Sequence, residues 1–292
     1  MKFNISQIIE FEKCPVRWYF RYVMRRVPRS TYEAWPLVLG THTHKFFERF
    51  FSNFLPQHHA ANLFLDECLN SNDLQPIDKR VKQAAQAEMM ATALRRWKSD
   101  YEFKTLNTEE VLEAPLGGHT LVGRLDRRVE YMSSMMHYQI KTMGTSTNLD
   151  AFITSRRRNS HELGYAYLIQ KNFGELPSKM FLNGIRKTTL NVLNSKPETV
   201  YVQEFIPLSE DQISGFLADT VRTFESMCGY ATISNWKEIP QRREADTNPY
   251  NGGKLDPYFW VLMGRDDIHG EELFMDLPTG DYWEERGKDV GE

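Results

Sequence analysis

The chain has 292 residues, of which 41% are hydrophobic and 26% are charged, a composition that excludes a disordered chain and is ordinary for a soluble globular protein. Its formal net charge of −3 excludes a uniformly basic surface for nucleic acid, so any basic patch must be local. No apolar run reaches the ~18 residues that a membrane span requires, and the N-terminal stretch lacks the order of a signal peptide. We therefore expect a cytoplasmic protein with no membrane partner.

The cysteines and the basic clusters set two further expectations. Cys14, Cys68 and Cys228 form an odd and scattered set, which argues against a disulfide framework and favours reduced thiols. Basic side chains gather at residues 21–29 and 155–158. Taken alone, each cluster is most simply interpreted as a solvated face.

The first third of the chain has helical patterns. Residues 5–25 predict a helix in two short pieces, broken between Cys14 and Pro15, because proline suits a first helical turn and not a helix interior. Residues 36–54 predict a helix that is apolar on nearly all sides and therefore buried. Residues 77–103 are rich in strong helix formers and predict a long amphipathic helix.

The pattern changes near residue 108 to that of an antiparallel meander. Two strands flank a turn at Gly117 and Gly118, and a four-residue turn at 133–136 leads into a third strand, HYQIKT. The later expected elements are a helix at 147–173, strands at 178–187 and 199–206, a helix at 209–228 and an irregular tail. Helices before, between and after a small sheet predict an α/β fold.

The domain organisation follows from the absence of a long linker. We expect a single domain over residues 1–292, with a helical part at 1–105, a core at 106–230 and a C-terminal lid at 231–292.

Three polar side chains of the meander are expected to meet on one face of the sheet. Residues two apart on a strand share a face, so Gln139 and Lys141 are neighbours, and the turn places Asp126 roughly across from them. This set suits phosphodiester hydrolysis, since a carboxylate can hold a divalent cation while a lysine activates water and offsets charge on phosphate. On this pattern alone, a solvated hairpin face is an equally open interpretation.

The apolar helix carries a second polar pair. His44 and Glu48 are four residues apart and share one helix face, whereas His42 lies on another. Such a pair in an apolar segment costs free energy unless it has a partner, which can be a metal ion. A self-satisfied structural pair is, at this point, the more ordinary interpretation.

Taken together, several stretches resemble the RecB-like branch of the PD-(D/E)XK nuclease superfamily, which includes CRISPR-associated and phage-borne exonucleases. QIKT lies where that branch has D-x-K-T or E-x-K-T, and HELGYAYLIQ takes the place of its Q-x3-Y helix. The other matching residues are Ser6, Phe11, Cys14, Pro15, Tyr19 and Phe20 in the opening helix, Gly40, His44 and Glu48 in a G-x3-H-x3-E element, and Asp126 ending a G-[RK]-[IL]-D strand.

The resemblance implies a restriction-endonuclease-like core, in which a small mixed sheet with an antiparallel meander is flanked by helices. It also implies a site for Mg²⁺ or Mn²⁺ with Lys141 as the catalytic lysine. The implied metal ligands are His44, Asp126, the side chain of Gln139 and the carbonyl of Ile140, and the implied catalytic set is Lys141, Asp126 and Gln139. The implied substrate-binding residues are Tyr165, His161, Arg124, Arg157 and Arg158, with Glu48 and Glu113 in support.

The chain departs from the family patterns at four places. Leucine precedes Asp126 where the superfamily has proline, a change that this branch commonly tolerates; Gln139 replaces an acid, and His161 replaces a glutamine. A fourth departure concerns iron and sulfur, because residues 247–264 contain no cysteine where cluster-bearing relatives have three. We therefore expect no iron–sulfur cluster, a buried thiol at Cys14 and a cluster-free lid that packs on the N-terminal helices.

The function that the resemblance implies is a metal-dependent DNA nuclease, an exonuclease rather than an endonuclease. Its expected partner is DNA, as single strands or duplex ends, together with recombination or replication proteins. Its expected setting is recombination, repair or phage replication in a bacterial or phage-infected cell. The alternative, favoured by Gln139, is an inactive or weakened descendant that binds DNA or a protein partner. A third interpretation is a structural α/β protein with a polar surface hairpin.

Overall fold

A computed structural model describes residues 1–28, 35–52, 54–71, 77–144, 147–156, 160–187, 200–234, 238–239, 250–251, 254–255 and 274–276. The chain divides into two compact units, one made of Met1–Ser6 with Trp35–Phe224 and the other of Gln7–Ala34 with Glu225–Glu292. The single-domain organisation that we expect from the sequence stays a prediction.

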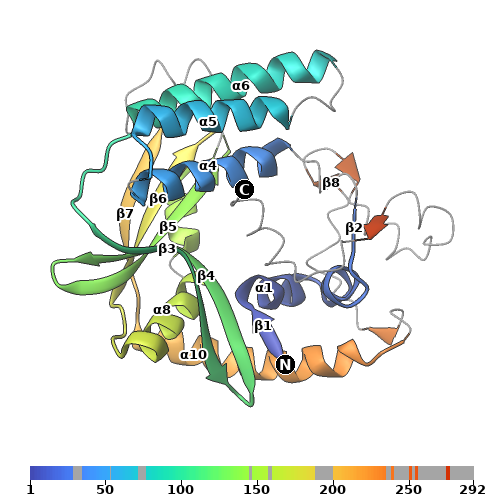
Figure 1. The fold of residues 1–292 in the computed structure, drawn as a ribbon. Helices are drawn as coiled ribbons and strands as arrows, with labels where there is room; N and C mark the ends of the chain where they lie inside the picture. The colour runs from blue at the N-terminus through green and yellow to red at the C-terminus, as the bar shows by residue number, and fades with distance from the viewer. Residues whose placement is uncertain are drawn as a thin grey trace. The chain divides into compact units, whose positions relative to one another are not determined.

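The first unit is built on a six-stranded mixed sheet (Figure 1). Its strands are β1 (Lys2–Asn4), β3 (Lys104–Leu116), β4 (His119–Tyr131), β5 (Ser134–Met143), β6 (Lys179–Arg186) and β7 (Tyr201–Pro207). The order is β1-β4-β5-β6-β7, with β3 also paired to β4. The β1–β4 and β5–β6 pairs are parallel and the others antiparallel. This mixed sheet and its β3–β4–β5 meander confirm the expected fold class.

Two tight turns connect the meander. Gly117 and Gly118 have φ of +57° and +78°, which suits the two-residue hairpin turn that the sequence predicts. The second turn also has two residues, Met132 and Ser133, with φ of +50° and +62°. The expected four-residue turn at 133–136 is therefore wrong, since β5 begins at Ser134. The shorter turn was missed because Met132 and Ser133 adopt a left-handed backbone conformation that normally favours glycine or asparagine.

Three helices, α4 (Trp35–Phe51), α5 (Gln57–Asn70) and α6 (Ile77–Arg96), share one hydrophobic core with β5 and β6. Phe46 and Phe47 of α4 are fully buried in it, as the apolar sequence predicts. The helix α5 is not among the expected elements. Its buried positions are two alanines, Phe64 and Cys68, a weaker apolar signal than the phenylalanines of α4.

The helix α8 (Ser160–Phe173) lies on β3, β4 and β5, where it packs closely against Gly123. A Cβ atom at Gly123 would stand 2.6 Å from a Leu168 methyl carbon and 2.8 Å from the Tyr165 ring, so the glycine lets α8 approach β4. The expected helix at 147–173 is two helices, α7 (Leu149–Arg156) and α8. The following helix, α10 (Glu210–Ala231), is as expected.

The second unit contains the N-terminal break that the sequence predicts. The helix α1 (Ile5–Lys13) ends before Cys14, and α2 (Pro15–Trp18) continues into a π-helix at Tyr19–Val23. Cys14 caps α2, because its Sγ accepts a hydrogen bond from the Arg17 N–H at 3.4 Å.

The other strands of this unit are short. They are β2 (Arg26–Pro28), which pairs with β10 (Phe274–Asp276), and β8 (Tyr250–Asn251), which pairs with β9 (Lys254–Leu255). Most of the expected lid at 231–292 lies outside the described residues. Across the part of the chain that the structure describes, no helix is both long and apolar enough to cross a membrane.

Candidate functional site

The candidate site lies where the sheet opens beside β4. β4 pairs with β5 only from Arg127 to Tyr131, and with β1 only from Thr120 to Val122. Both stretches also pair with β3, so β1 and β5 share the other edge of β4. Between them, the stretch 123–126 pairs with neither strand. Asp126 lies at this opening, and its Oδ2 accepts a hydrogen bond from the Ile140 N–H at 2.8 Å, where a ladder bond would otherwise form.

Three potential metal ligands converge there. His44 Nδ1 of α4 lies 3.4 Å from Asp126 Oδ1 and 4.0 Å from Glu109 Oε1. One ligand atom from each residue lies within 4.8 Å of the other two. His44 and Asp126 are therefore neighbours, as expected, and their role as metal ligands stays a prediction.

Glu109 is the acid that the sequence interpretation missed. Thr108 pairs with Arg127 and Glu110 with Leu125, so Glu109 stands opposite Asp126 and shares its face of the sheet. Its φ is +48°, a left-handed conformation that is strained for a residue with a side chain and is often found at functional sites.

The signal for Glu109 was present in the sequence. A two-residue turn at Gly117 and Gly118 pairs residues symmetrically around it, which sets Glu109 opposite Asp126. The expected supporting acid, Glu113, instead pairs with Lys2 at 2.7 Å.

The electrostatics of this cluster favour a cation. Burial raises the pKa of Asp126, but the charges of His44 and Lys141 outweigh it and hold that pKa well below its usual range. Burial and the Asp126 charge raise the pKa of Glu109, although Arg124 opposes them with its Nε 3.1 Å from Glu109 Oε2. Two carboxylates and an imidazole thus face one another at distances too long for good hydrogen bonds to His44. Their oxygen and nitrogen donors fit a divalent cation, which would relieve the repulsion.

The motif residues of β5 face α8. Arg127 pairs with Tyr138, so Asp126 and Gln139 occupy the next positions, which agrees with the expected hairpin register. Gln139 is fully buried, and its amide lies close enough to Glu162 of α8 to lower the pKa of that carboxyl. Lys141 shares the face of Gln139 and is partly exposed. The metal-binding roles of Gln139 and Ile140 and the catalytic role of Lys141 stay predictions.

His161 and Tyr165 of α8 lie under the same opening. Burial and the Lys141 charge lower the pKa of His161 to about 3, so its imidazole is neutral near pH 7. Burial, followed by the Asp126 charge, raises the pKa of Tyr165, so its phenol keeps its proton. The Tyr165 ring meets His137 edge-on, with centroids 4.6 Å apart. His161 and Tyr165, both uncharged near pH 7, can therefore donate or accept hydrogen bonds near the site. Their contact with substrate stays a prediction.

The other expected site residues are placed less directly. Arg124 is at the cluster, where it pairs with Glu109. Arg157 and Arg158 lie outside the described residues. Within the described chain, no ion pair joins His44 to Glu48; His44 turns instead to the two acids of the sheet. Glu162, which is 1% exposed, is a second acid near the site that the sequence interpretation missed, since nothing in HELGY marks it as buried.

Comparison with known proteins identifies the family. The chain matches the model of the PD-(D/E)XK nuclease superfamily over residues 2–251. It is similar to the crystal structure of a provisionally assigned exonuclease from Eubacterium rectale, with a TM-score of 0.49 and 11% sequence identity over 89% of this chain and 91% of that chain. No curated protein matches it significantly in sequence. Because the family model spans most of its length, the chain belongs to the PD-(D/E)XK nuclease superfamily.

Proposed function

We propose that this protein is a Mg²⁺- or Mn²⁺-dependent deoxyribonuclease, and more specifically an exonuclease that acts on duplex ends or single strands. The observation that carries the proposal is the cluster of His44, Glu109 and Asp126 at the opening beside β4, with Lys141 on the neighbouring strand. Membership of a nuclease superfamily supports hydrolysis of a nucleic acid. Recombination, repair or phage replication in the cytoplasm is the setting that we infer, with recombination or replication proteins as partners.

The geometry of the cluster supports the following roles. His44, Glu109 and Asp126 would hold the cation, and the Ile140 N–H keeps the Asp126 carboxylate in place. When bound, a divalent cation lowers the pKa of water and offsets charge on the phosphate. Lys141, on the face of β5 that Gln139 shares, orients the attacking water and donates hydrogen bonds to the phosphate oxygens through its ammonium group. The neutral side chains of Tyr165 and His161 contact the DNA backbone.

Glu109 supplies a carboxylate in place of the one that is missing at Gln139. With glutamine in place of an acid, the strand pair β4–β5 supplies one carboxylate where the resemblance implies two. Glu109, opposite Asp126 on β3, brings the count back to two carboxylates and one imidazole. This donor set suits Mn²⁺ better than Mg²⁺, because Mn²⁺ accepts nitrogen ligands more readily.

The first test is cleavage of end-labelled single- and double-stranded DNA with Mn²⁺ or Mg²⁺. We expect cleavage with Mn²⁺ at lower concentrations than with Mg²⁺, and none for Lys141→Ala. Release of mononucleotides from linear DNA, with covalently closed circles left intact, indicates an exonuclease, whereas nicking of circles would show an endonuclease.

The second candidate function is a non-catalytic DNA-binding module, and the substitution at Gln139 is the observation that favours it. If wild type and Gln139→Glu were both inert on every DNA form with Mn²⁺, while wild type retarded DNA in a gel, this function would replace the nuclease.

A further inference from the structure

Glu162 is a buried acid that the proposed ligand set does not use. It is 1% exposed on α8, and within the described residues neither carboxylate oxygen has a well-aligned hydrogen-bond donor. Its nearest cation is Arg156, whose Nη1 lies 3.9 Å from Oε1. Burial raises its pKa to about 7, although Lys141 and Arg156 oppose this effect. A carboxylate held in this way costs folding free energy, so a purely structural reason for it is weak.

Gln139 faces this acid from the sheet. It is fully buried, and neither polar atom of its amide has a well-aligned partner in the described chain. Glu162 is close enough for the amide to lower its pKa. The buried amide and the buried acid therefore face each other across the β5–α8 packing.

The charge of Lys141 acts on two acids, one on the sheet and one on α8. It shares the α8-facing side of β5 with Gln139, and its charge lowers the pKa of both Asp126 and Glu162. Within the described residues, the Lys141 ammonium forms no ion pair shorter than 4.0 Å. The Asp126 carboxylate already has His44 and the Ile140 N–H as partners.

A bound cation would change this balance. The charge of Asp126 would then be taken up by the metal, and less of it would act on Lys141. Glu162 is too far from the three-ligand cluster to belong to it, so its carboxyl group would stay available to the lysine, whose charge favours the ionised form.

We propose that Glu162, oriented by the Gln139 amide, is a positioning residue that holds the Lys141 ammonium in the site when Asp126 is engaged with metal. This inference rests on the proposed function. Gln139 and Glu162 then act as one pair, in which the acid stands on the helix and the amide on the strand.

The test uses Glu162→Gln, the exchanged double variant Gln139→Glu/Glu162→Gln, and Glu204→Gln as a control at an exposed acid of β7. The melting temperature of metal-free protein should rise by about 2 °C or more in Glu162→Gln, because a buried acid without a well-aligned hydrogen-bond donor is replaced by a neutral amide. Its affinity for Mn²⁺ in titration calorimetry should stay within about threefold of wild type. The single-turnover rate constant for cleavage should fall about 10-fold or more, whereas the steady-state KM for DNA should change little. The double variant should recover most of this loss, and Glu204→Gln should match wild type.

A further readout does not need cleavage. In Mg²⁺-loaded protein with ¹⁵N-labelled lysine, the Lys141 ammonium resonance, assigned by its loss in Lys141→Ala, should be observed in wild type and in the double variant but not in Glu162→Gln. If wild type fails to cleave DNA, the proposed function fails, and this resonance still decides the position of Lys141.

Three outcomes would overturn the inference. One is a lower melting temperature in Glu162→Gln with an unchanged Lys141 resonance, which would show a structural residue. Another is a tenfold weaker Mn²⁺ affinity, which would make Glu162 a metal ligand. The third is an unchanged cleavage rate.

Discussion

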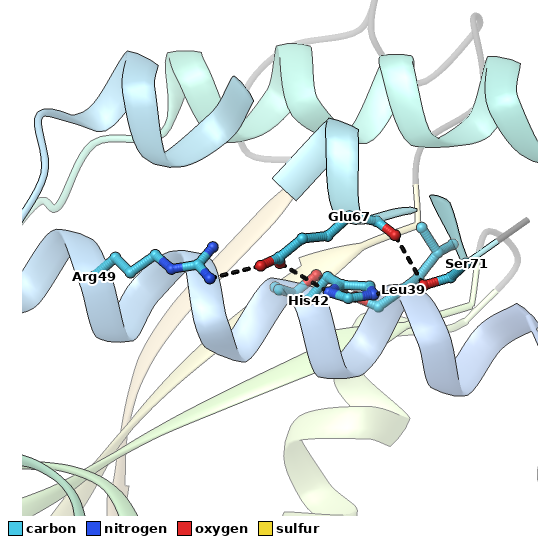
Figure 2. A network of polar contacts seen from close by, with 6 residues as sticks. Leu39, His42, Arg49, Glu67 and Ser71 are labelled. Atoms are coloured by element: carbon cyan, nitrogen blue, oxygen red, sulfur yellow. Dashed lines mark hydrogen bonds and ion pairs between the residues drawn. The ribbon is translucent and has the colours of Figure 1, made fainter. Parts of the chain in front are cut away.

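Two histidines of α4, two residues apart, enter two different polar clusters. His42 belongs to the α4–α5 network, which consists of His42, Arg49, Glu67 and Ser71 (Figure 2). Its Nδ1 lies 3.0 Å from Glu67 Oε2, its Nε2 lies 3.2 Å from Ser71 Oγ, and Arg49 Nη2 donates to Glu67 Oε1 at 2.6 Å. His44 faces the sheet, where its acids are 3.4 and 4.0 Å away. The expected separation of the two histidines on different helix faces is confirmed.

The clusters use the same residue types and differ in their charge balance. In the α4–α5 network one carboxylate serves a guanidinium and an imidazole; although burial raises the pKa of Glu67, His42 and Arg49 lower it to about 2. In the site two carboxylates compete for His44, and the pKa of Glu109 is raised. The short contacts and matched charges of the α4–α5 network indicate a structural role. The site has longer contacts, one more acid than its histidine can pair with, and a left-handed backbone at Glu109, and these features indicate a site that is completed by a cation.

The largest expected effect is at Lys141. Lys141→Ala should reduce single-turnover cleavage about 1000-fold or more, because no other described ammonium shares this face of β5 with Gln139. The melting temperature should change little, since Lys141 is partly exposed. Lys82→Ala, at an exposed position of α6, is the matched control. Equal loss of activity in both variants would count against a catalytic lysine.

Removal of a site acid is expected to weaken metal binding next most strongly. Glu109→Gln should reduce Mn²⁺ affinity about 10- to 100-fold, because the cation loses one of two negative ligands. Titration calorimetry with Mn²⁺ measures the change. Glu113→Gln, at the other end of β3 and paired with Lys2, should bind Mn²⁺ like wild type. If the two variants behaved alike, Glu109 would belong with the structural acids.

Gln139→Glu should have a smaller effect of opposite sign. Added negative charge near Asp126 should lower the Mn²⁺ concentration for half-maximal cleavage about two- to fivefold. The same charge would face Glu162, so the metal-free variant should melt at a lower temperature than wild type. Melting curves with and without Mn²⁺ measure both effects. An unchanged metal requirement would place residue 139 outside the reach of the cation.

The smallest effect is expected in the α4–α5 network, and it concerns stability alone. The folded pKa of Glu67 is about 2, below its ordinary value of 4.5, so its contribution is complete above the unfolded pKa and is lost as the pH falls toward 2. Glu67→Gln should cost about 1–2 kcal/mol at pH 7, a figure reduced for partial exposure. Urea unfolding at pH 7 and pH 3 should show this difference shrinking at pH 3, with Mn²⁺ affinity unchanged. A constant difference at both pH values would contradict an ionic role for Glu67.

Much of the architecture follows from local patterns in the sequence. The apolar run of α4, the proline after Cys14 and the paired glycines at 117 and 118 each specify their element through backbone preferences that act over a few residues. The same local rules place Asp126 near Gln139 and separate His42 from His44. The α5 helix and the Met132–Ser133 turn escaped prediction, because small buried residues and a left-handed turn without glycine carry weak local signals.

The sequence by itself determined which side chains share a strand or a helix face, because side-chain periods of 2 and 3.6 residues are local properties. The tertiary structure decided which faces meet. The opening between β1 and β5 on the edge of β4, the packing of α8 against Gly123 and the burial of Glu162 beneath Gln139 all join segments distant in the chain. Long-range packing sets burial and charge proximity, and these decide whether an acid serves structure, like Glu67, or a reaction site, like Glu109.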